Sequence, residues 1–279
     1  MRVIHEFDPW KFKLCTCPKK YSLNPYTGCA HGCLYCYAAS FIPRFREVRE
    51  KWNLLRNLER DLNELPRNSL ISMSNSSDPY PPIERDRKLT RACIKLICDY
   101  EMRLLVITKS DIVTRDIDLL SQTRCAVAIT VTGFSTRVFE PRAPSPEKRI
   151  EALRRLHEAG IPTILRLDPI MPWIKEEEIF KVLEKCSFVD HVVASTLKLK
   201  PHSFKEITTA FPRLKAELIR LYFVEGEKIG ASWYLPKSMR VELLRKVESW
   251  CKAHGISVAF CREGIDFKAK SCDGSHLIR

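Results

Sequence analysis

The chain of 279 residues is 45% hydrophobic and 29% charged, a composition typical of a globular protein that buries a large core. Its apolar runs are strand-sized, far short of the roughly 20 residues of a membrane-spanning helix, and its N-terminus has no apolar block, so we expect a cytoplasmic protein without a membrane partner. The formal charge of +13 favours anionic partners and makes nucleic acid a candidate, although an ordinary basic surface explains the charge equally well.

Short β-rich runs alternate with helical patterns from about residue 21 to about residue 200. The clearest helix has Ser145 as its N-cap and Pro146 at its first position, and Gly160 ends it. Strands are expected at 70–73, 104–108, 126–131, 161–167 and 191–195, with further helices near 48–64, 89–100, 115–121 and 175–186. About six βα units of this kind predict an α/β fold, a partial (β/α)6 barrel of the TIM type.

Beyond residue 200 the pattern changes to helical segments near 204–222 and 238–254, followed by a short apolar run at 256–260. We therefore expect a cysteine-containing N-terminal segment (1–20), the partial barrel (21–200), and a mainly helical C-terminal cap with a cysteine-containing tail (201–279). Catalytic groups in such barrels gather where the strands end, because the βα loops converge there.

Three of the twelve cysteines, Cys29, Cys33 and Cys36, lie within eight residues of one another, which indicates a metal site and not disulfides. Gly28 and Gly32 give this loop the backbone freedom that wrapping a metal cluster requires. Three thiolates leave one iron of a 4Fe–4S cluster open, and an open iron can bind and activate a ligand.

Two other interpretations of this loop come from different classes of protein. His31 could complete a Cys₃His zinc site, which would make the chain a zinc-containing nucleic-acid-binding protein without catalysis. A noncatalytic iron–sulfur electron carrier is the other, but its cluster is normally ligated by four cysteines. The long barrel pattern argues against a simple binding module.

The CxxxCxxC spacing, with the aromatic Tyr35 before its last cysteine, is the signature of radical S-adenosylmethionine (SAM) enzymes. Over nearly its whole length the chain resembles the spore photoproduct lyase-related branch of that superfamily, which is also called DNA-repair-photolyase-like. The matching stretches are 24–29, 74–84, 107–110, 140–145, 166–169 and 272–276.

The resemblance implies a lyase-like or transferase reaction in which a 4Fe–4S cluster cleaves SAM to a 5′-deoxyadenosyl radical that abstracts hydrogen from a substrate. It also implies an electron donor such as ferredoxin or flavodoxin. The substrate stays unidentified, with nucleic acid as a candidate.

By position, the resemblance places Tyr35 near the adenine of SAM, Ser77 near its amino group, Lys109 near its carboxylate and Thr130 near its ribose. An aromatic ring packs on adenine, a lysine pairs with a carboxylate, and hydroxyls satisfy polar groups. Ordinary core, surface and turn roles are the alternatives for these four residues.

Glu140 and Arg142 are further candidates for binding the cofactor, with a solvated loop as their alternative. Asp168 ends an apolar strand, so its carboxylate should be partly buried and need a partner, and we count it as a catalytic candidate. Spore photoproduct lyases have a hydrogen-donating cysteine where this chain has Ser76. A serine O–H bond is too strong for that role, so the same splitting of a thymine photoproduct is not expected.

Four other cysteines, Cys15, Cys17, Cys261 and Cys272, precede the barrel or follow it in apparent loops. Four thiolates suit a second, fully ligated iron–sulfur cluster or a Cys₄ zinc site. Unrelated thiols, or Cys272 alone as a hydrogen donor, are the alternatives. The remaining cysteines are expected to be buried packing residues: Cys93, Cys98, Cys125, Cys186 and Cys251.

Overall fold

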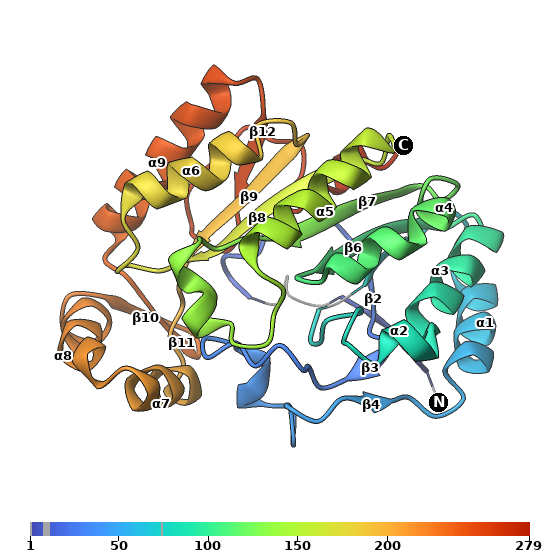
Figure 1. Cartoon of the computed structure of the whole chain (residues 1–279), viewed down its shortest axis with the longest axis horizontal. Coiled ribbons are helices and arrows are strands. Elements are labelled where there is room, and N and C mark those ends of the chain that lie inside the picture. Colours follow the sequence, from blue (N-terminus) through green and yellow to red (C-terminus); the bar gives the residue numbers. More distant parts are fainter. Residues whose placement is uncertain (1, 8–11, 74) are drawn as a thin grey trace.

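An eight-stranded sheet forms the centre of the fold in the computed structural model, which describes residues 2–7, 12–73 and 75–279 (Figure 1). All neighbouring strands run parallel except the first pair, and the two edge strands do not pair with each other, so the barrel is open. In sheet order the strands are β1 (Ile4–Glu6), β2 (Tyr21–Leu23), β5 (Leu70–Met73), β6 (Arg103–Thr108), β7 (Cys125–Thr130), β8 (Thr163–Ile170), β9 (His191–Thr196) and β12 (Ser257–Phe260).

Helices connect most of the parallel strands and cover the outer face of the sheet (Figure 1). In chain order they are α1 (Leu54–Glu64), α2 (Glu84–Arg87), α3 (Leu89–Asp99), α4 (Ile117–Leu120), α5 (Pro146–Glu158), α6 (Glu176–Lys185), α7 (Pro201–Ala210), α8 (Lys215–Leu218) and α9 (Lys237–Ala253). Two small antiparallel sheets complete the fold, β3 (Tyr26–Thr27) with β4 (Arg49–Glu50) and β10 (Glu227–Ile229) with β11 (Ser232–Tyr234).

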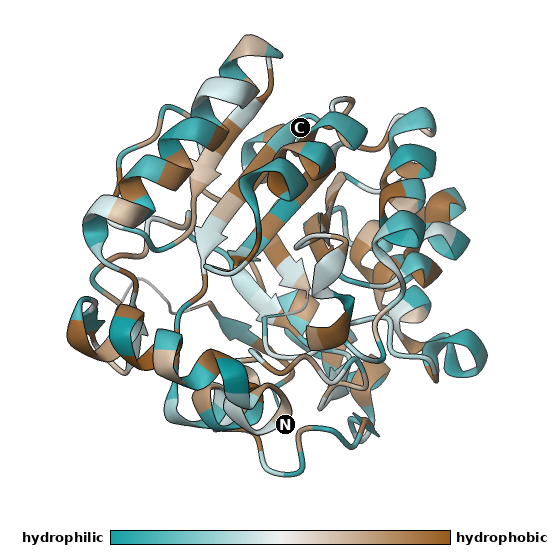
Figure 2. Ribbon diagram, turned by 60° about the vertical axis from the view of Figure 1, so that its left-hand side comes forward, coloured by the Kyte–Doolittle hydropathy of each residue, from teal (hydrophilic) through white to brown (hydrophobic). Residues whose placement is uncertain are grey.

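Local sequence signals explain the best-defined elements. The Ser145 Oγ accepts a hydrogen bond from the Lys148 N–H at the start of α5, and Gly160 takes a left-handed φ of 74° after its end. Every residue of β7 is buried, as expected for a parallel strand covered on both faces. Figure 2 shows hydrophobic residues along the strands, whereas hydrophilic and hydrophobic residues alternate around the helices.

Several elements differ from the sequence prediction, three of them in ways that matter for the fold. The helix expected near 48–64 begins only at Leu54, because residues 49–50 form β4. The strand expected from residue 161 begins at Thr163. The apolar run near 256–260, assigned to the helical cap, forms β12 and pairs with β9 in the main sheet. A four-residue run does not identify its partner, so only the tertiary structure placed this strand.

The C-terminal tail covers the inner face of the sheet. Ile278 packs with Leu105, Ala128 and Val193, whose side chains point away from the helices, and it is 5% exposed. The much larger hydrophobic core lies between the sheet and the outer helices. Among the described residues, no helix is both long and apolar enough to cross a membrane.

Candidate active site

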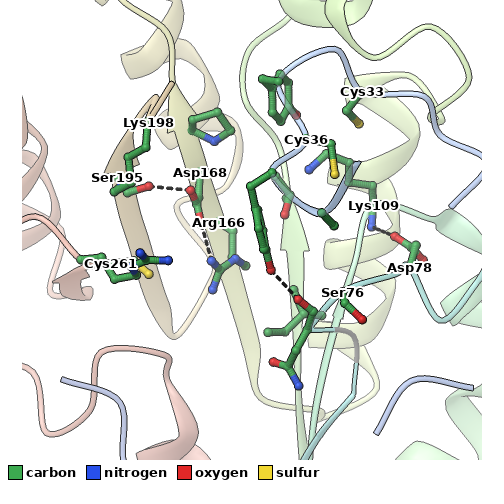
Figure 3. A pocket seen from close by; sticks show the side chains of 18 of the residues that line it. Cys33, Cys36, Ser76, Asp78, Lys109, Arg166, Asp168, Ser195, Lys198 and Cys261 are labelled. Carbon is green, nitrogen blue, oxygen red and sulfur yellow. Dashed lines mark hydrogen bonds and ion pairs between the residues drawn. The ribbon is translucent and has the colours of Figure 1, made fainter. Parts of the chain in front are cut away.

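A cavity of about 670 Å³ opens where the parallel strands end. Its N-terminal wall consists of the loop from residue 29 to residue 36 and the residues that follow β5, β6 and β7. Its C-terminal wall consists of the ends of β8, β9 and β12 and the residues that follow them. Figure 3 shows Cys33 and Cys36 on one side of the cavity and Ser195 and Cys261 on the other.

Cys29, Cys33 and Cys36 line the N-terminal wall. The Cys29 N–H donates to the Phe45 carbonyl at 2.7 Å, which anchors the start of the loop. Gly28 has a φ of 83°, and a Cβ there would lie 2.2 Å from the Glu47 carbonyl oxygen, so no other residue fits without moving the backbone. The sequence therefore dictates a tight loop with three thiols facing one space.

Burial raises the pKa of the Cys29 thiol to about 12, and the nearby Asp78 carboxylate raises it further. Burial also raises the pKa of Cys33 and Cys36. These thiols are protonated until a positively charged partner compensates the thiolates, and metal ions provide such compensation. Within the described residues, no three His, Cys, Asp or Glu side chains are arranged to hold a single metal ion.

His31, the fourth ligand of the zinc interpretation, has a different partner. Its Nε2 lies 3.0 Å from Asp78 Oδ2, and both side chains are buried. Asp78 also accepts hydrogen bonds from the Thr108 Oγ1 at 2.7 Å and from the Lys109 N–H at 2.8 Å. Burial opposes the ionisation of Asp78, but His31 and these hydrogen bonds lower its pKa. Asp78 thus joins the cysteine loop to the end of β6.

The four residues expected at the cofactor, Tyr35, Ser77, Lys109 and Thr130, all line the cavity. The Lys109 Nζ lies 5.6 Å from the centre of the Tyr35 ring. The Ser77 Oγ donates to a backbone carbonyl, that of Tyr26, at 2.8 Å. The structure therefore brings together on one wall residues that are far apart in the sequence.

Glu140 and Arg142 do not line the cavity. Glu140 is fully buried, where it accepts a hydrogen bond from the Tyr35 hydroxyl and pairs with Arg149 and Lys109. Arg142 is exposed, and only its N–H reaches the cysteine loop, donating to the His31 carbonyl at 3.1 Å. The expected role at the cofactor stays a prediction for both, and in the structure Glu140 is the hydrogen-bond partner of Tyr35, which does line the cavity.

Asp168 lies in the C-terminal wall, as its place at a strand end suggested. It pairs with Arg166 and accepts a hydrogen bond from the Ser195 Oγ at 2.5 Å (Figure 3). Burial opposes its ionisation, but Arg166, Lys198 and Ser195 outweigh burial and lower the pKa of Asp168 to about 2. The carboxylate is therefore ionised at neutral pH.

Arg166 and Lys198 also line the C-terminal wall, and the sequence interpretation missed Arg166 as a site residue. Arg166 was detectable, because it lies two residues before Asp168 in the same strand and therefore on the same face. Lys198 follows β9, and its Nζ lies 2.8 Å from Glu263 Oε1. Glu263 also pairs with the buried Arg240 of α9 and accepts a hydrogen bond from the Thr196 N–H at 2.7 Å, which fixes the segment after β12 against the end of β9. The partner of Lys198 is 65 residues away, so no local pattern indicates it.

The second set of cysteines lines the same cavity: Cys15, Cys17, Cys261 and Cys272. The sulfurs of Cys17 and Cys272 lie 3.2 Å apart. Ser76 lines the cavity as well, on the N-terminal wall (Figure 3). The stretch from residue 74 to 84 that contains it begins at Ser74, which lies outside the described residues.

Comparison with known proteins identifies similar sequences. A family model described as the Radical SAM superfamily matches residues 23–186. The uncharacterized protein MJ0683 of Methanocaldococcus jannaschii is 35% identical over 223 residues, which cover 72% of this chain and 85% of that protein. A radical SAM Nalpha-GlyT isomerase of Pseudomonas phage M6 is 22% identical over 86% of this chain and 53% of the phage protein.

Solved structures share the fold. A mutant of spore photoproduct lyase with bound AdoMet and dinucleoside spore photoproduct aligns with a TM-score of 0.70 and 19% identity, over 94% of this chain and 81% of that chain. Streptococcus suis SuiB bound to S-adenosylmethionine aligns with a TM-score of 0.57 and 11% identity, over 86% and 49% of the two chains. At these identities the likeness concerns the partial TIM-like barrel alone.

Proposed function

The chain belongs to the radical SAM superfamily and is a radical SAM enzyme, and we propose that Cys29, Cys33 and Cys36 hold its 4Fe–4S cluster. The family implies both this cluster and SAM as cofactors. Membership of an enzyme family argues against the zinc-containing binding protein and the electron carrier.

The residues present suit such a cluster. Three thiols come from one tight loop, face one cavity and leave a fourth iron without a protein ligand. When bound and reduced, the cluster supplies the electron that cleaves SAM to a 5′-deoxyadenosyl radical, which takes a hydrogen atom from the substrate. A carrier such as ferredoxin or flavodoxin would deliver that electron.

The observation that carries the proposal is the convergence of four side chains on the wall that holds the cysteine loop. Lys109 presents a positive charge for the carboxylate of SAM, Ser77 a hydroxyl for its amino group, and Thr130 a hydroxyl for its ribose. Tyr35 offers an aromatic face to the adenine, and Glu140 holds its hydroxyl so that the ring cannot turn away.

The substrate is proposed to carry an anionic group that binds beside Lys200 and Arg262 on the C-terminal wall. Neither side chain has a carboxylate partner within the described part of the chain, and the Arg262 Nε is buried without a hydrogen bond. Burial lowers the pKa of Lys200, and the neighbouring charge of Arg262 lowers it further. An anion between them would relieve this repulsion.

A nucleic acid is the anionic substrate that we propose. The net charge of +13 supports it, and so does the likeness in fold to a spore photoproduct lyase solved with a bound dinucleoside photoproduct. Ser76 has no thiol to donate hydrogen, so the reaction on that nucleic acid is not proposed to be photoproduct splitting by the same route.

The chemistry is tested by anaerobic reconstitution with iron and sulfide, followed by dithionite and SAM. We expect 5′-deoxyadenosine and a change in the spectrum of the reduced cluster when SAM binds. A fully loaded cluster that forms no deoxyadenosine, with a spectrum unchanged by SAM, would show that the proposal is wrong.

The substrate class is tested separately with a single-stranded oligonucleotide. We expect binding that weakens steeply as salt rises, and a loss of about tenfold or more when Lys200 and Arg262 are both changed to Glu. Lys205→Glu is the matched control, because Lys205 is exposed on α7 and does not line the cavity. Absence of binding at low salt would exclude nucleic acid.

A further inference from the structure

The cysteines of the chain separate into two groups. Seven of the twelve line the single cavity described above, and five lie elsewhere in the fold. Three of the seven form the loop already assigned to the catalytic cluster. The other four belong to no motif of the superfamily model, because they all lie outside residues 23–186: Cys15, Cys17, Cys261 and Cys272.

These four thiols come from both ends of the chain. Cys15 and Cys17 precede β2, Cys261 directly follows β12, and Cys272 lies in the tail. Within the group, Cys17 hydrogen-bonds to Cys15 and to Cys272, with its sulfur 3.2 Å from that of Cys272. Cys261 lies within electrostatic range of the other three. Packing alone does not explain why four thiols gather at a cavity wall instead of in the core.

Three cations surround the group. Lys20 is 2% exposed and pairs with Asp273 at 2.5 Å, next to Cys272. Arg166 and Lys198 approach the group from β8 and β9, near Cys261. Each of these cations is paired with a carboxylate, Lys20 with Asp273, Arg166 with Asp168 and Lys198 with Glu263, so the charged groups around the thiols balance one another.

We propose that Cys15, Cys17, Cys261 and Cys272 bind a second iron–sulfur cluster. A zinc ion needs four donors around one point, and within the described residues no three such donors are arranged to hold a single ion. A four-iron cluster takes one thiolate on each iron, so it accepts a wider spread of sulfurs. Rotation of the Cys17 and Cys272 side chains would separate their sulfurs on deprotonation.

Such a cluster would form part of the C-terminal wall, because Cys261 lies across the cavity from Cys33 and Cys36 (Figure 3). It would also tie the N-terminal segment to the tail that covers the inner face of the sheet. All four of its irons would have protein ligands, so SAM would not bind to it. This property separates it experimentally from the catalytic cluster.

The test removes the catalytic cluster and asks what remains. In the full chain with Cys29, Cys33 and Cys36 all changed to Ala, anaerobic reconstitution should leave about four irons and four sulfides per chain. The electron paramagnetic resonance spectrum of the reduced protein should not change when SAM is added. Adding Cys17→Ala and Cys272→Ala should remove the remaining iron, whereas adding Cys98→Ala, a cysteine outside the cavity, should not.

A second measurement covers the case in which the triple variant does not fold. The unmodified chain should bind about eight irons, and the variant with only Cys17→Ala and Cys272→Ala about four, while still forming deoxyadenosine. One zinc per chain in place of iron would overturn the proposal, and so would a folded triple variant without metal or with a Cys17–Cys272 disulfide. Failure of SAM cleavage would leave the iron count unchanged, so the two proposals fail independently.

Discussion

The two walls of the cavity are backed by the same arrangement of charges. Behind the N-terminal wall, the buried Glu140 lies between Arg149 and Lys109. Behind the C-terminal wall, the buried Glu263 lies between Arg240 and Lys198. The two lysine side chains are equally exposed, at 15% and 16%.

The difference lies in how tightly each lysine is paired. The Lys109 Nζ is 3.9 Å from Glu140, whereas the Lys198 Nζ is 2.8 Å from Glu263 and also donates to the Thr196 carbonyl at 3.2 Å. Lys109 therefore keeps hydrogen-bonding capacity for a ligand, whereas Lys198 is committed to holding β9 against β12. Two ion networks of the same kind therefore have different roles: the one with Lys109 serves ligand binding, and the one with Lys198 serves the structure.

Loss of a cysteine on the N-terminal wall should have the largest effect. Changing Cys36 to Ala leaves one iron of the catalytic cluster without its thiolate, so deoxyadenosine formation should fall by at least about 10³-fold. The assay is product formation under dithionite, with Cys98→Ala as the control. Retention of more than a tenth of the activity would contradict the assignment of this wall to the cofactor.

Removal of either buried glutamate should destabilise the fold strongly. Glu140→Gln and Glu263→Gln each leave a buried arginine without its carboxylate, and each should lower the free energy of unfolding by about 3–5 kcal/mol. Urea denaturation of the metal-free chain measures this loss. Only Glu140→Gln should also weaken SAM binding, because only Glu140 holds Tyr35. Equal effects on SAM binding would remove the distinction between the walls.

The two lysines provide a matched pair of variants. Lys109→Ala should raise the SAM concentration needed for half-maximal deoxyadenosine formation by about 10–100-fold. That factor corresponds to the binding free energy contributed by one hydrogen bond to a charged group. Lys198→Ala should change it by less than about threefold, because the charge of Lys198 is neutralised within the protein. A larger effect from Lys198 would place the SAM carboxylate on the wrong wall.

The smallest predicted effect is a change in stability at acid pH. The folded pKa of Asp168, about 2, lies below its ordinary value of about 3.9, so its ion pair stabilises the fold fully above about pH 4. This contribution, at most about 2 kcal/mol, should be lost as the pH falls from 4 to 2. The difference in unfolding free energy between the metal-free parent and Asp168→Asn should shrink over that range. Ser195→Ala should lose part of the same contribution. If the difference in unfolding free energy between the parent and Asp168→Asn did not change with pH, the assigned pairing would be contradicted.

The sequence predicted the parts of the site that depend on local structure. The cysteine loop, the capped helix α5 and four cavity-lining residues on the N-terminal wall follow from short motifs and from their positions after strands. Such residues are brought together by any parallel barrel, because strand ends always meet at the same edge. The position of Glu140 and Arg142 outside the cavity lining was not predictable, because a position in a loop does not show which way a side chain points.

Only the tertiary structure decided the contacts between residues that are far apart in the sequence. Tyr35 meets Glu140 across 105 residues, and Lys20 meets Asp273 across 253 residues. β12 reaches the main sheet only after the long insertion of α7, α8 and α9. Periodicity describes the neighbours of a residue within one helix or strand, whereas these pairs depend on how whole elements pack. The sequence by itself therefore determined the barrel and its cysteine loop, and packing decided which charges and thiols share the cavity.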